Sequence, residues 1–184
     1  MYKTNIRKLP SGVSLKHFTS GESVVDDFLY RNAVNREQRD IFSTTVFFTE
    51  DQEKIIGFYS LAASIVEVKN PYDASLLGTL ETMGNDVSII PFPAIELTWL
   101  GVDKQFQRKR HGTMLLKSLF QDILIARDQL NIGVSGVQVS ALPGAVEFYQ
   151  HFGFKYLHMN YDRVAVFPET YPLFIAMRDI RDVI

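Results

Sequence analysis

The chain has 184 residues, which is the size of one ordinary globular domain. Nineteen basic residues against twenty-one acidic ones give a formal net charge of −2, and 46% of the residues are hydrophobic. This near-neutral balance argues against a protein that coats nucleic acid, because phosphate binding needs concentrated Lys and Arg. Cysteine is absent, which excludes disulfides, zinc ribbons and thiol nucleophiles.

The sequence carries no sign of export or membrane insertion. The N-terminal residues lack the apolar core of a secretory signal. The longest apolar-rich stretch, residues 55–68, is too short to span a membrane and contains Glu67. We therefore expect a cytoplasmic protein with a single domain over residues 1–184 and no membrane partner.

The first half of the chain predicts one helix followed by strands. Apolar residues recur with helical spacing over residues 22–34, and Thr19 or Ser20 could cap this helix. Residues 43–68 are rich in β-branched and aromatic side chains and predict two strands around an acidic turn. Residues 93–103 predict a further strand, apolar on both faces as a central strand would be. Pro and Gly make residues 70–93 loop-like.

The second half alternates helices and strands. A broad apolar stripe predicts a strong helix over residues 112–130. A strand over 134–141, a short helix over 143–151 and a strand from Phe154 follow. Residues 160–172 are loop-like, and residues 172–180 predict a last strand. This alternation implies an α/β fold with a mixed sheet.

One short loop concentrates positive charge between a strand that ends near Asp103 and a helix that begins near His111 or Gly112. It contains Lys104, Arg108, Lys109 and Arg110. A helix N-terminus presents unpaired N–H groups and partial positive charge, so this loop could bind a phosphate or pyrophosphate. A solvated surface turn explains the same residues about equally well.

Two motifs in this region resemble a known family. QRKRHG at 107–112 resembles the acetyl-CoA signature Q/R-x-x-G-x-G/A of the GCN5-related N-acetyltransferases, and LGVDKQF before it resembles the end of the family's preceding strand. ALPGAVEFYQHFGF at 141–154 resembles the family's A-x-x-FY-x-x-x-GF segment. The resemblance covers about residues 15–178. It implies a single α/β domain, with a mixed, mostly antiparallel sheet of six or seven strands flanked by helices.

The resemblance also implies site residues, with acetyl-CoA as co-substrate and no metal. Backbone groups would hold the pantetheine and diphosphate at Leu100, Gly101, Val102, Gln107, Arg108, Lys109, Arg110, His111, Gly112 and Thr113. Two positions depart from the family: Arg110 replaces the signature's first glycine, and Leu142 stands where many members carry Asn. His17, His151 and His158 lack the spacing of metal ligands.

The resemblance implies that Tyr149 is the acid that protonates the leaving thiolate. The alternative is that Tyr149 only packs against Phe148 and Phe152. The candidate base is Glu96, in an otherwise apolar strand, where burial would raise the pKa of its carboxyl. The alternative is that Glu96 is exposed or forms a salt bridge, and that water acts as the base. Since the chain has no cysteine, acetyl transfer is expected to be direct.

The stretches GFYSLA, which contains Phe58, Tyr59 and Ser60, and GESVVDDFL at 21–29 resemble a subgroup of the family that contains toxins. Those toxins belong to toxin–antitoxin pairs and acetylate aminoacyl-tRNA. The three residues of the first stretch could line an acceptor pocket or pack in the core. Without the four loop cations the rest of the chain has fifteen basic and twenty-one acidic residues, which argues against a tRNA substrate.

We therefore expect an acetyl-CoA-dependent N-acetyltransferase that acts on a primary amine of a small molecule, a protein or a peptide. The alternative is a toxin that acetylates aminoacyl-tRNA and is paired with an antitoxin. A non-catalytic module that binds CoA is a further alternative. An exposed edge strand near the C-terminus could pair with a second copy of the chain to form a homodimer.

Overall fold

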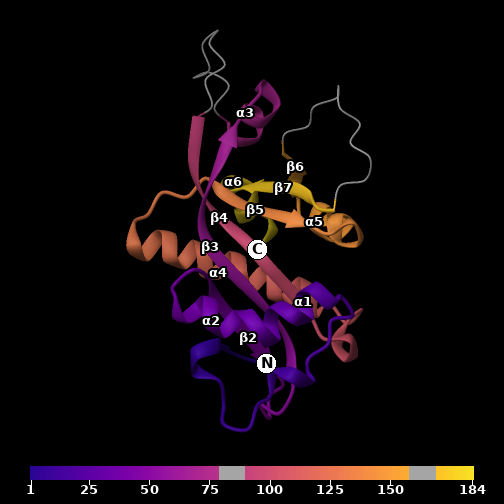
Figure 1. The fold of residues 1–184 in the computed structure, drawn as a ribbon. Helices are drawn as coiled ribbons and strands as arrows, with labels where there is room; N and C mark the ends of the chain where they lie inside the picture. The colour runs from indigo at the N-terminus through magenta and orange to yellow at the C-terminus, as the bar shows by residue number, and fades with distance from the viewer. Residues whose placement is uncertain (79–89, 158–168) are drawn as a thin grey trace. The chain divides into compact units, whose positions relative to one another are not determined.

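The computed structural model describes residues 1–78, 90–157 and 169–184. The chain forms two compact units, one of residues 1–62 and 97–123 and the other of residues 63–96 and 124–184. Two long strands, β3 and β4, contribute to both units. Figure 1 shows the ribbon of both units, coloured along the chain.

The described residues contain seven strands, hydrogen-bonded in the order β1-β2-β3-β4-β5-β7-β6. In the first unit β1 pairs with β2 and β2 with β3, and in the second unit β5 and β6 both pair with β7, all antiparallel. Helices flank this mixed, mostly antiparallel sheet, which confirms the expected fold class. The strands are β1 Tyr2–Asn5, β2 Ser43–Phe48, β3 Ile55–Val68, β4 Ile90–Val102, β5 Gly136–Ala141, β6 Lys155–Tyr156 and β7 Tyr171–Ala176.

The helices differ widely in length. In the first unit, α1, the π-helix η3 and α2 follow one another without a break, and α4 is the longest helix described. The helices are α1 Ser23–Asp27, η3 Phe28–Asn32, α2 Ala33–Gln38, α3 Pro71–Leu77, α4 His111–Leu130, α5 Val146–His151 and α6 Met177–Val183. Short 3₁₀ turns are η1 Ile6–Lys8, η2 Leu15–His17, η5 Lys104–Phe106 and η6 Pro143–Ala145. Among the described residues, no helix is long and apolar enough to cross a membrane.

The core of the first unit combines the apolar stripe of α4 with a group of stacked aromatic rings. Leu115, Leu116, Leu119 and Phe120 of α4 are fully buried, as the helical spacing predicts. The ring of Phe28 in η3 stacks on Trp99 of β4, with centroids 4.5 Å apart and planes 11° apart. These contacts pack the N-terminal helices against the end of β4.

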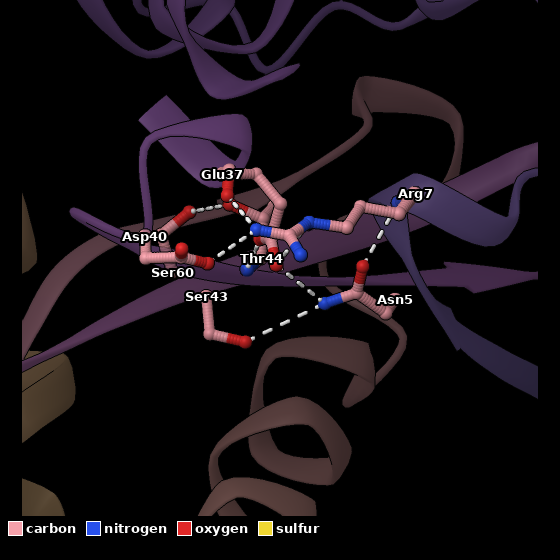
Figure 2. A network of polar contacts seen from close by, with 7 residues as sticks. All are labelled: Asn5, Arg7, Glu37, Asp40, Ser43, Thr44 and Ser60. Carbon is pink, nitrogen blue, oxygen red and sulfur yellow. Dashed lines mark hydrogen bonds and ion pairs between the residues drawn. The ribbon is translucent and has the colours of Figure 1, made fainter. Parts of the chain in front are cut away.

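A buried carboxylate fixes α2 to the neighbouring strands of the first unit (Figure 2). Glu37 is 4% exposed, accepts a hydrogen bond from Asn5 Nδ2 at 2.9 Å and another from the backbone N–H of Thr44, and forms an ion pair with Arg7. Arg7 also contacts Asp40 at 2.6 Å. Because a buried charge is costly unless it is hydrogen-bonded, these donors explain how Glu37 can be buried.

The second unit has its own apolar core. Residues from β3, α3, β4 and β7 meet there with Leu157, which directly follows β6: Val66, Leu76, Ala94, Leu157, Phe174 and Ala176. The guanidinium of Arg178 in α6 donates to the carbonyl oxygens of Ser75 and Leu76 at 3.2 and 3.1 Å. The Ser75 carbonyl also accepts from the N–H of Gly78 at 3.2 Å, so Arg178 and Gly78 together satisfy carbonyl groups at the end of α3.

Three sequence-based expectations were wrong. Residues 71–77, expected in a loop, form α3, with Asn70 Oδ1 capping its start and Gly78 at φ 72° ending it. The last strand ends at Ala176, and α6 occupies the remainder of the stretch expected as strand. Neither Thr19 nor Ser20 is the N-cap of α1, a position that Glu22 holds without a side-chain bond. Residues 90–93, expected in the same loop, form the start of β4. Residues 79–89 of the first predicted loop and most of the second, up to residue 168, lie outside the described residues.

Candidate active site

The turn after β4 is built around a buried carboxylate. Asp103 is 3% exposed, and its two side-chain oxygens accept hydrogen bonds from the backbone N–H groups of Thr19 and Gln105, both at 2.9 Å. Its backbone oxygen accepts from Phe106 and Gln107 at 2.8 and 3.1 Å. The sequence therefore turns sharply at Asp103 and directs residues 107–110 towards the start of α4.

The backbone of this loop is suited to hold an anion. Arg108 and Arg110 have left-handed backbone angles, φ 57° and 63°. Within the described part of the chain, no acceptor contacts the N–H groups of residues 108–113, the last three of which open α4. Successive free N–H groups around left-handed residues form concave sites for phosphate, and the start of a helix adds partial positive charge.

The side chains around the loop add uncompensated positive charge. Lys104, Arg108, Lys109 and Arg110 are all exposed, and none forms an ion pair with a carboxylate among the described residues. Lys109 Nζ instead donates to the carbonyl oxygen of Gln105 at 2.8 Å. A diphosphate is a ligand whose charge and acceptor atoms match these free amides and cations.

Two side chains of the motif hold the loop in place. Gln107 Nε2 donates to the carbonyl oxygens of Ser20 and Val102, at 2.7 and 2.9 Å. His111 Nδ1 lies 2.9 Å from the carbonyl oxygen of Phe106. Arg110 adopts a left-handed backbone although it replaces the signature's glycine, at a cost of about 1 kcal/mol. The departure at Arg110 therefore leaves the turn itself intact.

The end of β4 is packed tightly in the first unit. A Cβ atom on Gly101 would lie 2.8 Å from both Phe58 and Val25, so only glycine fits there. The N–H of Asp103 donates to the carbonyl oxygen of Ile56 at 2.9 Å, which ties the end of β4 to β3. Leu100 and Val102 are half-buried on either side of Gly101.

Tyr149 lies in α5 of the second unit and is 5% exposed. Its ring packs edge-on against Phe148 and Phe154 at 5.2 and 5.3 Å, so the expected packing contact with Phe148 is present. Among the described residues no group hydrogen-bonds to its hydroxyl. Burial raises the pKa of the Tyr149 phenol, so it keeps its proton at neutral pH.

Glu96, the candidate base, lies on β4 in the second unit and is half-buried. No donor or cation contacts its carboxylate among the residues the structure describes. The full burial that would favour it as a base is thus not found. Its neighbour two residues before, Ala94, is buried at 4% exposure.

Phe58, Tyr59 and Ser60 are all at most 1% exposed. The hydroxyl of Tyr59 donates to Asp122 at 2.6 Å, and that of Ser60 lies 2.8 Å from Thr44 Oγ1. These contacts favour the interpretation of all three as core residues rather than as the lining of a pocket. The described residues contain no group of three or more His, Asp or Glu that could hold a metal ion.

Comparisons with known proteins identify the family of the chain. Residues 43–156 match the family model for the acetyltransferase (GNAT) domain. A relative from Mycobacterium tuberculosis (strain ATCC 25618 / H37Rv), named tRNA-acetylating toxin, is 29% identical over 150 residues, which are 81% of this chain and 82% of the relative.

Two similar solved structures show the same fold. One is AtaTR bound with acetyl-CoA, at a TM-score of 0.74, 21% identity and coverage of 98% of this chain and 95% of that chain. The other is a mutant AtaT toxin bound to the C-terminus of the antitoxin AtaR and acetyl-CoA, at 0.73, 20% identity and the same coverage. With the family match over residues 43–156, the chain belongs to the GNAT acetyltransferases and uses acetyl-CoA as its acetyl donor.

Proposed function

We propose that this enzyme transfers the acetyl group of acetyl-CoA to the α-amino group of an aminoacyl-tRNA, and that it acts as the toxin of a toxin–antitoxin pair. The observation that carries the proposal is the relative named tRNA-acetylating toxin, which aligns with 81% of the chain. The sequence alone favoured a small-molecule or peptide amine. This relative supports the tRNA alternative better than that first interpretation.

Charge is unevenly distributed between the two units. The first unit contains 13 basic and 10 acidic residues, a balance of +3, whereas the second contains 6 basic and 11 acidic residues, a balance of −5. The net charge of −2 is therefore an average over two unlike units. Phosphate binding depends on local cation density, and the surplus of the first unit lies in the four cations of residues 104–110, because without them this unit has 9 basic and 10 acidic residues. The charge balance therefore carries no argument for a tRNA substrate, and the proposal rests on the relative.

The state of Glu96 also supports an α-amino acceptor. An α-amino group has a pKa of about 7.7–8.0, so a sizeable fraction is neutral at physiological pH, whereas a lysine side chain at about 10.4 is almost fully protonated. An α-amine needs little help from a base. The half-buried, uncontacted Glu96 suits such an acceptor better than it suits lysine.

In the proposed reaction the neutral amine attacks the thioester carbonyl, the new N–C bond forms, and the C–S bond breaks. The N–H groups of residues 108–113 hold the diphosphate, and backbone groups of Leu100–Val102 stabilise the carbonyl oxygen as it gains negative charge. The Tyr149 hydroxyl gives its proton to the leaving thiolate. The amine loses its proton to water or to Glu96.

An antitoxin is the partner that the proposal implies. The AtaT toxin is bound to the C-terminus of its antitoxin AtaR in a structure that resembles this chain. We propose that an antitoxin also binds this enzyme and suppresses acetyl transfer.

Protein synthesis in a cell extract tests the proposed function, because an acetylated α-amine can no longer attack a peptidyl ester. Adding the enzyme with acetyl-CoA should stop synthesis, whereas the enzyme in extract depleted of acetyl-CoA should not. The Tyr149→Phe variant should inhibit protein synthesis far more slowly than the wild-type enzyme. Unaffected synthesis, together with acetylation of small amines or peptides, would favour the first interpretation instead. Acetyl-CoA binding without turnover on any amine would favour the non-catalytic module.

A further inference from the structure

Two segments that are more than eighty residues apart in the sequence are joined beside the diphosphate loop. The N–H of Thr19 donates to Asp103 Oδ2 at 2.9 Å, and the N–H of Lys104 donates back to the carbonyl oxygen of Thr19 at 2.8 Å. Gln107 Nε2 donates to the carbonyl oxygen of Ser20 at 2.7 Å. Three hydrogen bonds thus connect residues 19–20 to the loop.

Asp103 is the centre of this connection. Its carboxylate is 3% exposed, with one oxygen bound to Thr19 and the other to Gln105 at the start of η5. A carboxylate so deeply buried is stable only when donors satisfy it. A single side chain therefore holds both the first turn of the loop and the segment beside it.

Apolar packing leaves one side of this turn unsupported. A pocket of about 260 Å³ lies there, and Phe18, Asp103, Gln105 and Phe106 are among the residues that line it. Because no side chain fills this space, packing cannot fix the position of η5 on that side. On that side the position of η5 depends on the hydrogen bonds that Asp103 accepts from Thr19 and Gln105.

The segment on the far side of these bonds is itself anchored. Asp26 in α1 accepts hydrogen bonds from Thr19 Oγ1 at 3.0 Å and from the Ser20 N–H and hydroxyl at 2.7 and 2.6 Å. Helix α1 leads directly into η3, where Phe28 stacks on Trp99. The loop is thus connected through residues 19–20 to the aromatic core of the first unit.

We propose that Asp103 is a positioning residue for acetyl-CoA: it holds the loop of residues 107–113 in its anion-binding shape by tying it to Thr19. The proposal rests on the diphosphate site described above, and it does not depend on which amine is the acceptor. Both carboxylate oxygens of Asp103 accept backbone N–H groups, and Asp103 is not among the residues assigned to the diphosphate. Its loss should therefore weaken acetyl-CoA binding while the acetyl transfer step, once acetyl-CoA is bound, stays nearly unchanged.

The test measures acetyl-CoA affinity by calorimetry, which needs no acceptor. Asp103→Asn keeps one acceptor oxygen and places an NH₂ group against an N–H donor, so acetyl-CoA should bind about tenfold more weakly. Where the acceptor is known, KM for acetyl-CoA should rise by the same factor with kcat within twofold. If tRNA is not the acceptor, this measurement still tests the role of Asp103, because it records only the binding of acetyl-CoA.

Two variants at Thr19, outside the loop, test the same hydrogen bond between the Thr19 N–H and Asp103. Thr19→Pro removes the N–H that Asp103 accepts, and Phe18 before it already has the extended backbone that proline requires, φ −76° and ψ 137°. Thr19→Val keeps that N–H and removes only the hydroxyl bond to Asp26. Proline should weaken acetyl-CoA binding severalfold, and valine should leave it within twofold.

A generic loss of stability is excluded by a matched control in the same unit. Tyr59→Phe removes the partly buried hydrogen bond to Asp122, away from the loop, and should lower the melting temperature without changing acetyl-CoA affinity. Unchanged affinity in both Asp103→Asn and Thr19→Pro overturns the proposal. An equal loss of affinity in Tyr59→Phe overturns it as well. If Asp103→Asn does not fold, Thr19→Pro against Thr19→Val decides.

Discussion

The phenol of Tyr59 donates a hydrogen bond to Asp122 at 2.6 Å, which joins β3 to α4 inside the first unit. The same carboxylate accepts from Lys3 Nζ at 2.7 and 2.8 Å, so β1 is connected to the same point. Burial and the hydrogen bond to Asp122 raise the pKa of Tyr59 well above its ordinary value. Tyr59 therefore keeps its proton and donates this hydrogen bond at neutral pH.

Tyr59→Phe should lower the free energy of unfolding by about 1 kcal/mol, because the partly buried hydrogen bond is lost while Lys3 still neutralises Asp122. Urea unfolding measures the difference. Tyr2→Phe is the matched control, since Tyr2 is 41% exposed and should change stability by less than about 0.5 kcal/mol. Equal effects in the two variants would show that the Asp122 bond contributes nothing.

Acetyl-CoA should stabilise the fold through the free amides and cations of residues 104–113. At a concentration of about a hundred times its dissociation constant, the gain in unfolding free energy should be roughly 2.7 kcal/mol. Thermal unfolding with and without acetyl-CoA measures this as a rise in melting temperature. The absence of both a shift and a calorimetric signal would contradict the assignment of the loop.

Tyr149→Phe should slow acetyl transfer about a hundredfold, because the variant cannot protonate the leaving thiolate. The ring still packs against Phe148 and Phe154, so acetyl-CoA affinity should stay within twofold. Tyr156→Phe in β6 is the control and should leave the rate unchanged. If Tyr149→Phe turns over at the wild-type rate, Tyr149 is a packing residue only.

Asp26 should make the fold sensitive to acid. Partial burial raises the pKa of this carboxyl, but hydrogen bonds from the Ser20 hydroxyl and N–H and from the Thr19 hydroxyl outweigh burial and hold it below its ordinary value. The stabilisation is therefore complete at neutral pH and is lost as the pH falls below about 4.

Asp26→Asn should accordingly be less stable than the wild type at pH 7, and the gap should narrow at pH 3. Denaturant unfolding at both pH values measures it. Asp27→Asn is the control, because Asp27 is exposed and pairs with Arg31 on the helix surface. A gap for Asp26→Asn that does not change with pH would contradict this role.

The sequence predicted those elements whose apolar pattern matches their burial. The stripe of α4 was read correctly because Leu115, Leu116 and Leu119 repeat with the helical period and are fully buried. Helix α3 was missed although its signals are present: Asn70 caps it, Pro71 occupies its first turn and Gly78 ends it. Pro and Gly at the two ends of so short a helix are also typical of loops, and the residues between them are too few to show a clear helical period.

The candidate site was predictable only in part, for a physical reason. The cation loop is local in sequence, so its charge and its place before α4 could be read directly. The bonds of Asp103 to Thr19 and of Gln107 to Ser20 depend on chain segments meeting in space, and no periodicity records them. The half-buried position of Glu96 likewise depends on tertiary packing around β4.

The most direct test of the proposed function follows labelled acetyl groups from acetyl-CoA into three acceptors offered together. These are aminoacyl-tRNA, the same tRNA without its amino acid, and a lysine-containing peptide. We predict that label appears on the α-amino group of the aminoacyl-tRNA, that Tyr149→Phe slows its appearance, and that the other two acceptors stay unlabelled. Label in the peptide alone, with aminoacyl-tRNA unmodified, would contradict the proposed function.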